Sequence, residues 1–353
     1  MDYYTFVLGD TNQNADDQTS MEEILQEIEM ADRGGFTGCF VAEHHNHRPQ
    51  SMTSRPGLLI AAAATRTRHL RFGTMVTILG IHHPYFVAEE IATLDVLSGG
   101  RIEYGFGAGG PVWWRQVGAD QKEAADRMDE GIPLLQRFLT GEEIDYAGRF
   151  WSGSKARVVP EPVQRSVPLW LSGHSADSIS RAARLGLSFC TGFVSCATVR
   201  QRRELYWQQW EQTHSDLAPG RVGHMILAAV GESKAEIERL IVPAMREKLF
   251  DFAKSTLGKR NDPGFTFDQA LRERYDVLTW DELIDNGIIV YGSVEECRDR
   301  LGYIADNAGE VLLLQVRFGD LDRSFARESL ARLTDEVLPS IGGRASEAEL
   351  AET

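Results

Sequence analysis

The chain has 353 residues, of which 42% are hydrophobic and 25% are charged, a composition typical of a globular enzyme of one large or two average domains. The formal net charge of −15 disfavours binding to nucleic acid or to anionic membranes, which requires clustered Lys and Arg. Basic runs such as Arg200–Arg203 are short, and this one lies in a helical pattern beside Glu204 and is interpreted as a solvated helix face. We therefore expect neither a nucleic-acid partner nor a membrane partner.

The N-terminal residues have the pattern of a strand and not of a signal peptide, because no basic segment precedes an apolar one. No apolar stretch approaches the roughly 18 residues that a transmembrane helix needs. The four cysteines form no CxxC pair, which favours free thiols in a reducing compartment over a disulfide framework. These features predict a cytoplasmic protein.

Short apolar runs alternate with longer helical patterns along most of the chain, as in a parallel sheet with crossover helices. The predicted strands are Tyr4–Leu8, Gly38–Ala42, Arg71–Thr77, Ile102–Gly107, Leu169–Ser172, Ser188–Thr191, Val222–Val230 and Val311–Val316. Eight strands that alternate with helices predict an α/β fold of the (β/α)₈ TIM-barrel type, with residues 1–341 as a single domain.

Two segments interrupt this alternation. Residues Ile144–Val159 have a sheet-like pattern, and a longer insertion at Ser255–Asn286 precedes the last crossover helix. Insertions of this length often act as lids, so we expect one here. Ser293 and Glu296 predict a capping box at the start of that crossover helix, and the small, charged tail at Gly342–Thr353 is expected to be flexible.

Histidines gather where the predicted strands end, which is where TIM barrels place their catalytic groups. Six of the nine lie in such segments: His44, His45, His47, His82, His83 and His174. The first three have a spacing that could suggest a metal site, but successive strand residues point to opposite faces, so we expect no metal. A general acid/base role for His44 is favoured instead, because an imidazole exchanges protons near neutral pH.

The end of the fifth strand runs from Gly173 and His174 into a helix that has Ser175 and Ser178 in its first turn. Such a helix end can hold phosphate, but the serines are equally consistent with an ordinary N-cap, and the residues alone do not decide. The glycine-rich run Gly105–Gly110 lacks a complete G-x-G-x-x-G motif and is interpreted as a place where a flat ring approaches the backbone.

Several segments in this order resemble one family, the bacterial luciferase-like flavin monooxygenases. They are Phe40–His45, His83–Pro84, Ala88–Glu89, Ala92–Arg101, Phe150–Trp151, Ser172–Ser178 and Val290–Glu296. The resemblance implies a barrel that holds reduced FMN at its C-terminal mouth, with His44 as the catalytic residue and a non-proline cis peptide near Met75.

The resemblance also implies which residues surround the cofactor and the substrate. The implied cofactor-binding residues are Glu43, Thr74, Met75, Gly107, Ala108, Gly109, Gly173, His174, Ser175 and Ser178. The implied substrate pocket comprises His45, His83, Trp113, Trp114 and Phe193.

Two positions depart from luciferase. Ala108 stands where luciferase has an arginine that contacts the flavin phosphate, so FMN affinity is expected to be weak or to be arranged otherwise. The run around Ala108 looks more like the Baeyer–Villiger members of the family. His174 replaces an acidic residue, and its positively charged form would suit a phosphate.

The activity implied is a two-component monooxygenase that oxygenates a small, fairly hydrophobic organic substrate with O₂ through a flavin C4a-(hydro)peroxide, by hydroxylation or by Baeyer–Villiger reaction. An NAD(P)H:flavin reductase would supply the reduced FMN, and a homodimer is expected. Two alternatives stay open: hydride transfer with the deazaflavin F420 on the same barrel, and a non-catalytic flavin-binding subunit. The presence of His44 favours an enzyme.

Overall fold

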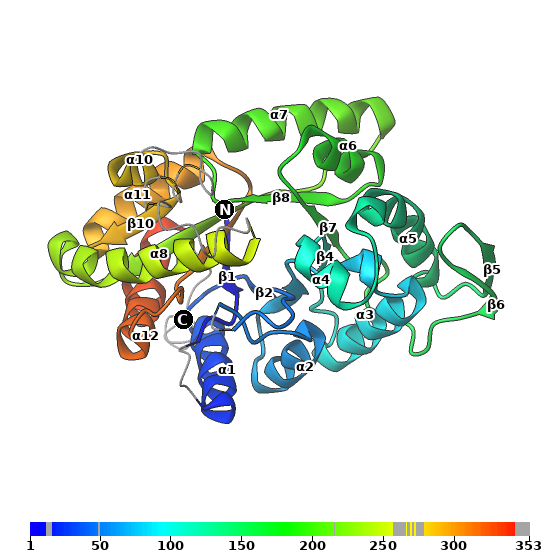
Figure 1. Ribbon diagram of the computed structural model, residues 1–353, viewed down its shortest axis with the longest axis horizontal. Helices are drawn as coiled ribbons and strands as arrows, with labels where there is room; N and C mark the ends of the chain where they lie inside the picture. The colour runs from blue at the N-terminus through cyan, green and yellow to red at the C-terminus, as the bar shows by residue number, and fades with distance from the viewer. Residues whose placement is uncertain are drawn as a thin grey trace.

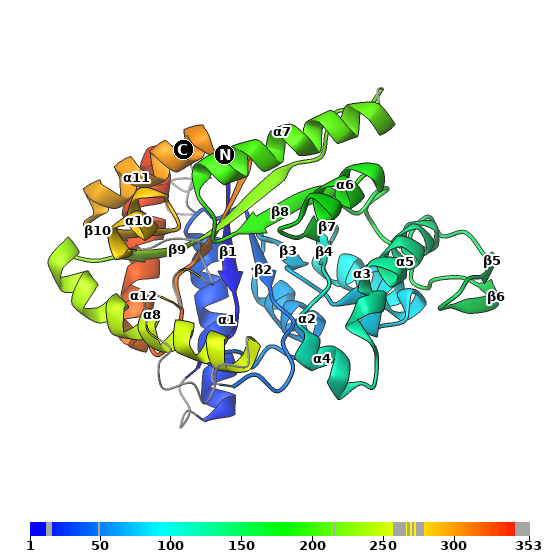
Figure 2. The same cartoon turned by 45° about the horizontal axis from the view of Figure 1, so that its top comes forward.

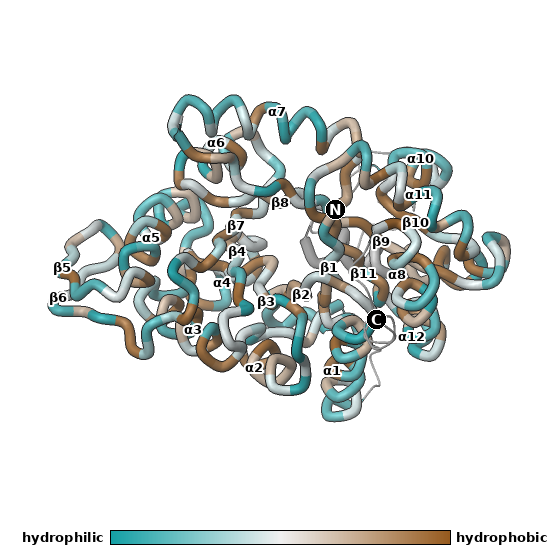
Figure 3. Tube along the Cα trace, turned by 180° about the vertical axis from the view of Figure 1, so that it is seen from behind, coloured by the Kyte–Doolittle hydropathy of each residue, from teal (hydrophilic) through white to brown (hydrophobic). Residues whose placement is uncertain are grey.

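The computed structural model describes residues 1–11, 16–48, 50–214, 216–256, 266, 269, 272 and 279–342. Parallel strands stand around a central axis and helices surround them (Figure 1). The tube seen from behind shows mainly apolar colours along the strands and more hydrophilic colours on the outer helices (Figure 3). The chain is therefore an α/β barrel whose apolar strands are covered by amphipathic helices.

The ring of strands follows the order β3-β2-β1-β11-β9-β8-β7-β4, and β10 pairs with β9 outside this path. Parallel bridges from Phe72 to Ile102 and from Thr77 to Phe106 join β3 to β4 and nearly close the ring. The strands are β1 (Asp2–Val7), β2 (Gly38–Val41), β3 (Arg71–Thr74), β4 (Tyr104–Phe106), β7 (Leu169–Ser172), β8 (Ser188–Gly192), β9 (Val222–Val230), β10 (Ile289–Gly292) and β11 (Val311–Gln315).

The helices follow the strands as crossover connections. They are α1 (Asp17–Arg33), α2 (Pro56–Arg66), α3 (Pro84–Ser98), α4 (Pro111–Gln116), α5 (Ala124–Phe138), α6 (Ala176–Arg184), α7 (Cys196–Thr213), α8 (Lys234–Thr256), α10 (Trp280–Asp285), α11 (Val294–Asn307) and α12 (Arg323–Arg332). None of these described helices is long and apolar enough to cross a membrane.

The structure confirms the predicted barrel and its eight ring strands, with shifts of a few residues at their ends. The sheet-like excursion is an antiparallel hairpin of β5 (Ile144–Ala147) and β6 (Ser152–Ala156) at one edge of the molecule (Figure 1). The capping box of Ser293 and Glu296 opens α11 as predicted. Strand β10 was not predicted, although the run from Ile288 to Tyr291 is entirely apolar.

The expected lid at 255–286 lies mostly outside the described residues. Its described end is α10, which Thr279 and Glu282 open with a capping box. The expected flexible tail also lies outside the described residues, apart from Gly342.

The two faces of each barrel strand pack into different layers. Phe40 on β2 stacks on Tyr4 of β1, with ring centroids 5.0 Å apart, and meets the ring of Trp170 on β7 edge-on at 5.8 Å. Because β2 and β7 are not neighbours in the sheet, these rings meet inside the barrel. Their sequence neighbours Tyr3 and Leu171 belong instead to the layer between strands and helices, as the two-residue period of a strand requires.

A buried carboxylate organises the N-terminal end of the barrel interior. Glu103 is 1% exposed and accepts hydrogen bonds from Tyr4 (2.7 Å), Arg71 (2.5 Å), Trp170 (2.7 Å) and Arg221 (2.5 Å). These donors come from four different strands or strand starts. This end of the barrel is therefore held together by one satisfied charge cluster, which leaves the opposite end for a binding site.

Candidate functional site

A cavity of about 900 Å³ opens where β4 and β7 end, at the C-terminal side of the barrel. Seven of the ten residues predicted to bind the cofactor line it: Gly107, Ala108, Gly109, Gly173, His174, Ser175 and Ser178. The structure therefore brings together the two glycine-containing strand ends that the sequence singled out separately.

Close packing of β3 against β4 shapes one wall of the cavity. The peptide between Met75 and Val76 is cis, as the resemblance implies. A Cβ atom on Gly107 would lie 2.7 Å from Cγ2 of Val76, and one on Gly105 would lie 2.3 Å from the carbonyl oxygen of Thr74. Only glycine lets the two strand ends approach this closely, which leaves bare backbone facing the cavity.

Thr74 and Met75 are buried and are not among the residues that line this cavity. The Thr74 hydroxyl donates to the carbonyl of Gly105 at 2.8 Å, so it fastens β3 to β4 behind the wall. Their predicted contact with the cofactor stays a prediction.

Another wall of the cavity includes the N-terminus of α6. Ser175 and Ser178 form a capping box there: the Ser175 hydroxyl accepts from the amide of Ser178, and the Ser178 hydroxyl accepts from the amide of Ser175. A Cβ atom on Gly173 would lie 2.3 Å from the Ser178 hydroxyl, so glycine is needed for this cap. The N-cap interpretation is confirmed, and the same helix end faces the cavity, where phosphate binding stays a prediction.

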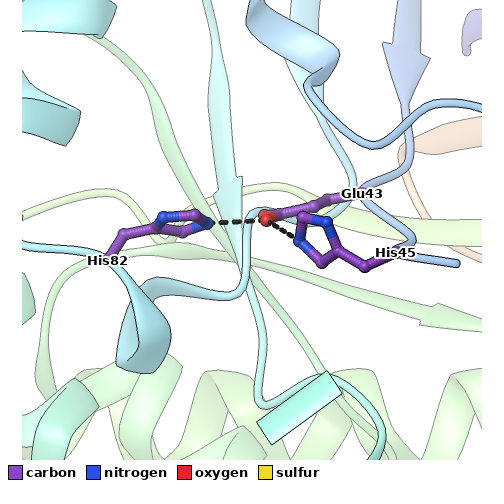
Figure 4. A group of neighbouring side chains, drawn as sticks. All are labelled: Glu43, His45 and His82. Carbon is purple, nitrogen blue, oxygen red and sulfur yellow. Dashed lines mark hydrogen bonds and ion pairs between the residues drawn. The ribbon is translucent and has the colours of Figure 1, made fainter. Parts of the chain in front are cut away.

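Next to this cavity, a carboxylate joins two of the strand-end histidines (Figure 4). Oε1 of Glu43 lies 2.7 Å from Nε2 of His45 and 2.6 Å from Nε2 of His82, and Oε2 accepts the amide hydrogen of Ile78 at 2.8 Å. Glu43 is 3% exposed. Burial alone would raise the pKa of Glu43, but the hydrogen bonds from both histidines and Ile78 outweigh it and lower the pKa to about 2.

The same three residues have the chemistry of a metal site, since their ligand atoms lie within 4.8 Å of one another. An ion bound at 2.0–2.1 Å would hold its ligand atoms roughly 3.3 Å apart in tetrahedral geometry. The oxygen–nitrogen distances of 2.6 and 2.7 Å are shorter than this and match hydrogen bonds. The geometry therefore favours a carboxylate that accepts from two imidazole Nε2–H groups.

The predicted catalytic residue, His44, lies in an aromatic group beside the cavity. Its ring stacks on Trp113 with centroids 4.7 Å apart, and the ring of His47 lies 5.3 Å away. Trp113 belongs to α4, where the next residue, Trp114, lines the cavity. His44 is half-buried. It is thus held next to the cavity wall by ring contacts.

The remaining predicted pocket residues lie in different environments. Trp114 is fully buried and donates from Nε1 to the carbonyl of Ala108 at 2.7 Å, so it braces the Gly107–Gly109 turn. Phe193 is buried in the cluster inside the barrel. His83 caps α3, packs near Tyr146 of the hairpin and is not among the residues that line the cavity.

Sequence reasoning placed His82 among the strand-end histidines but gave it no role in the site, unlike its neighbour His83. Both follow the third strand, and the sequence does not show which of two adjacent side chains turns toward Glu43. The sequence did contain a signal for this contact. Glu43 at the end of one strand needs hydrogen-bond donors if it is buried, and His82 follows the end of the neighbouring strand.

Residues 1–309 match the family described as luciferase-like monooxygenase. The chain belongs to the luciferase-like monooxygenase family. It is an enzyme of the flavin-dependent monooxygenase type.

Two relatives illustrate the range of the family. The chain is 39% identical to 4-hydroxyprotoasukamycin monooxygenase of Streptomyces nodosus subsp. asukaensis, over 90% of this chain and 86% of that protein. It is 31% identical to the oxygenase component of the flavin-dependent trigonelline monooxygenase of Acinetobacter baylyi, over 49% of each.

Solved structures share the fold at lower identity. The oxygenating constituent of 3,6-diketocamphane monooxygenase from Pseudomonas putida, a type II Baeyer–Villiger enzyme in complex with FMN, aligns with a TM-score of 0.78 at 18% identity, over 97% of this chain and 99% of that one. An F420-dependent secondary alcohol dehydrogenase aligns with a TM-score of 0.74 at 16% identity, over 96% and 98%. At these identities the likeness establishes the barrel alone.

Proposed function

We propose that the protein is the oxygenase component of a two-component monooxygenase. It would bind reduced FMN in the cavity between β4, β7 and α6, and would use O₂ to oxygenate a small, fairly hydrophobic organic substrate by hydroxylation or Baeyer–Villiger reaction. The observation that carries this proposal is the cavity itself, which the glycine wall and the α6 N-terminus enclose beside His44. Two similar proteins support it: the trigonelline monooxygenase, which is named as an oxygenase component, and the 3,6-diketocamphane monooxygenase, whose structure contains FMN.

The residues present fit FMN. The cavity of about 900 Å³ is large enough for a mononucleotide, and such sites commonly span 300–1,000 Å³. The bare backbone of Gly107 and Gly109 suits a flat ring, while the end of α6 suits a phosphate. When bound, the reduced flavin supplies the activation of O₂.

The chain's own side chains would position the reactants and move protons. His44, oriented by its stacking on Trp113, is the proposed acid/base residue and would give or take one proton at an imidazole nitrogen. Glu43 would fix the following loop through its bonds to His45 and His82. The buried Trp114 would keep water from the glycine turn.

A stopped-flow experiment tests the proposal. Protein with photoreduced FMN under nitrogen is mixed with oxygenated buffer, and a transient absorbance that outlasts the oxidation of free reduced FMN is expected. The variant His44→Ala should bind reduced FMN but lose about 10²–10⁴-fold in turnover. A control variant, His214→Gln, alters a histidine that bonds to the Ala183 carbonyl and should react as wild type does.

Reoxidation at the rate of free flavin would count against oxygenation. It would favour the second candidate, hydride transfer with F420, which the shared barrel of the F420-dependent alcohol dehydrogenase supports. Binding of F420 in place of FMN would then identify the cofactor.

We also propose two protein partners. A separate NAD(P)H:flavin reductase would supply reduced FMN, in keeping with the oxygenase-component name of the trigonelline relative. A second copy of the chain would cover the apolar side chains that α2 and α3 expose: Leu58 is 73% exposed, Phe86 65% and Leu97 52%. Sedimentation should show two chains per particle, and Phe86→Lys should shift the chain toward the monomer.

A further inference from the structure

The phosphate end of the proposed FMN site has little positive charge on its walls. Ala108 supplies none, and the guanidinium of Arg181 is held by Asp129 through bonds of 2.8 and 3.1 Å. Asp177 places a negative charge in the first turn of α6, facing the same cavity. Arg115 and Lys122 also line the cavity, but both are exposed to water, where salt screens their charge.

One further cation, the guanidinium of Arg202, lies behind His174, which lines the cavity. Arg202 comes from α7, which lies beside α6 (Figure 2). Its NH1 donates to the hydroxyl of Thr191 and lies 3.4 Å from Nδ1 of His174. The sequence placed Arg202 in a basic run interpreted as a solvated face, but this side chain turns inward.

Arg202 is a half-buried charge without a carboxylate partner. Among the described residues it forms no ion pair, and burial lowers the pKa of its guanidinium, although the group remains charged at neutral pH. Taking a charge out of water is costly unless an opposite charge approaches it. An anion arriving at the neighbouring cavity would provide that charge.

The contact with Arg202 also determines which ring nitrogen of His174 carries a proton. A guanidinium has donors and no acceptor, so Nδ1 of His174 must accept. The ring is therefore neutral and carries its proton on Nε2, the nitrogen on the other side of the ring. This differs from the expectation that a positively charged His174 meets the phosphate.

We propose that Arg202 is the positioning residue for phosphate recognition. It holds His174 as a neutral Nε2–H donor at the cavity wall and supplies, from behind that wall, the positive charge that selects a flavin 5′-phosphate over the unphosphorylated flavin. This inference rests on the proposed function, since it concerns the same FMN site.

Anaerobic equilibrium dialysis of reduced FMN and reduced riboflavin tests the selectivity. The variant Arg202→Gln should weaken FMN binding by about tenfold and leave riboflavin binding unchanged, because the phosphate loses the positive charge behind the wall and the oriented His174 donor. Arg202→Lys should recover part of the preference. Arg200→Gln is the matched control, since Arg200 lies on the same helix, is exposed and bonds only to Asn307 among the contacts described.

A second measurement needs no flavin. In the nitrogen-15 spectrum of the unliganded protein, His174 should show a protonated Nε2 and an accepting Nδ1, and Arg202→Gln should remove that fixed tautomer. An equal loss of FMN and riboflavin binding in Arg202→Gln, an unchanged preference for FMN, or a protonated Nδ1 in wild type would each overturn the inference. Wild type that binds neither flavin would instead refute the proposed function, while the nitrogen signals would still report on Arg202 and His174.

Discussion

Glu43 offers the sharpest test of how the strand ends of the site are held. The substitution Glu43→Gln keeps the shape of the side chain but replaces one of two accepting oxygens by a donor. Whichever way the amide turns, either Ile78 or the histidine pair loses its acceptor. The pKa of Glu43 falls from 4.5 to about 2, which corresponds to about 3 kcal/mol of stabilisation of the folded state at pH 7. Because Glu43 is almost fully buried, solvent screening does not reduce this value much.

Urea unfolding of both proteins between pH 3 and pH 7 measures this difference. A lowered folded-state pKa stabilises the protein above pH 4.5 and loses its effect as pH falls toward 2. Wild type should therefore exceed Glu43→Gln by about 3 kcal/mol at pH 7, and the gap should shrink below pH 4.5. The exposed Glu161, paired with Arg157 at the surface, serves as control, because Glu161→Gln should leave unfolding nearly unchanged. A loss below about 1 kcal/mol at pH 7, or a gap independent of pH, would refute the account of Glu43 as an ionised double acceptor.

Three further changes test other parts of the structure. Burial lowers the pKa of His224 to about 4, so the free energy of unfolding should fall by up to about 3 kcal/mol as pH drops from 6.5 to 4. In a thermal unfolding series at different pH values, His224→Gln should remove this pH dependence. Glu103→Gln leaves two of its four donors without an acceptor and should cost about 3–5 kcal/mol in urea unfolding; a cost near zero would show that its charge cluster is not needed. Gly173→Ala places a Cβ atom 2.3 Å from the Ser178 hydroxyl, so reduced FMN should bind more weakly while the barrel stays folded by circular dichroism.

The barrel could be predicted because its signal repeats. Each ring strand is a short apolar run between helical patterns, and eight such runs leave few alternative folds. Strand β10 escaped prediction because it does not belong to that repeat: it pairs only with the second half of β9, from Leu227 to Val230. A single apolar run of four residues beside a helix carries no such periodic support.

The sequence could predict where the candidate site lies, but not which side chains point into it. Strand ends gather at one side of a parallel barrel, and Gly107 and Gly173, which the resemblance implies as cofactor-binding residues at two strand ends, line the same cavity. Which side chain of an adjacent pair turns inward depends on the packing of the connecting loop. His82 turns toward Glu43, while its neighbour His83 does not line the cavity. Arg202 likewise turns inward from its basic run, because it donates to Thr191 on β8.

The hydrogen bonds of the site also narrow the roles that its histidines can take. Nε2 of His45 is engaged with Glu43, and Nε2 of His82 is engaged with the same oxygen. Moving a proton through either nitrogen would break a bond that keeps Glu43 ionised, and would cost part of the roughly 3 kcal/mol that the lowered pKa represents. His44 is oriented by ring contacts with Trp113 and His47. These bonds argue against His45 or His82 as the acid/base residue, so the proposed acid/base role stays with His44.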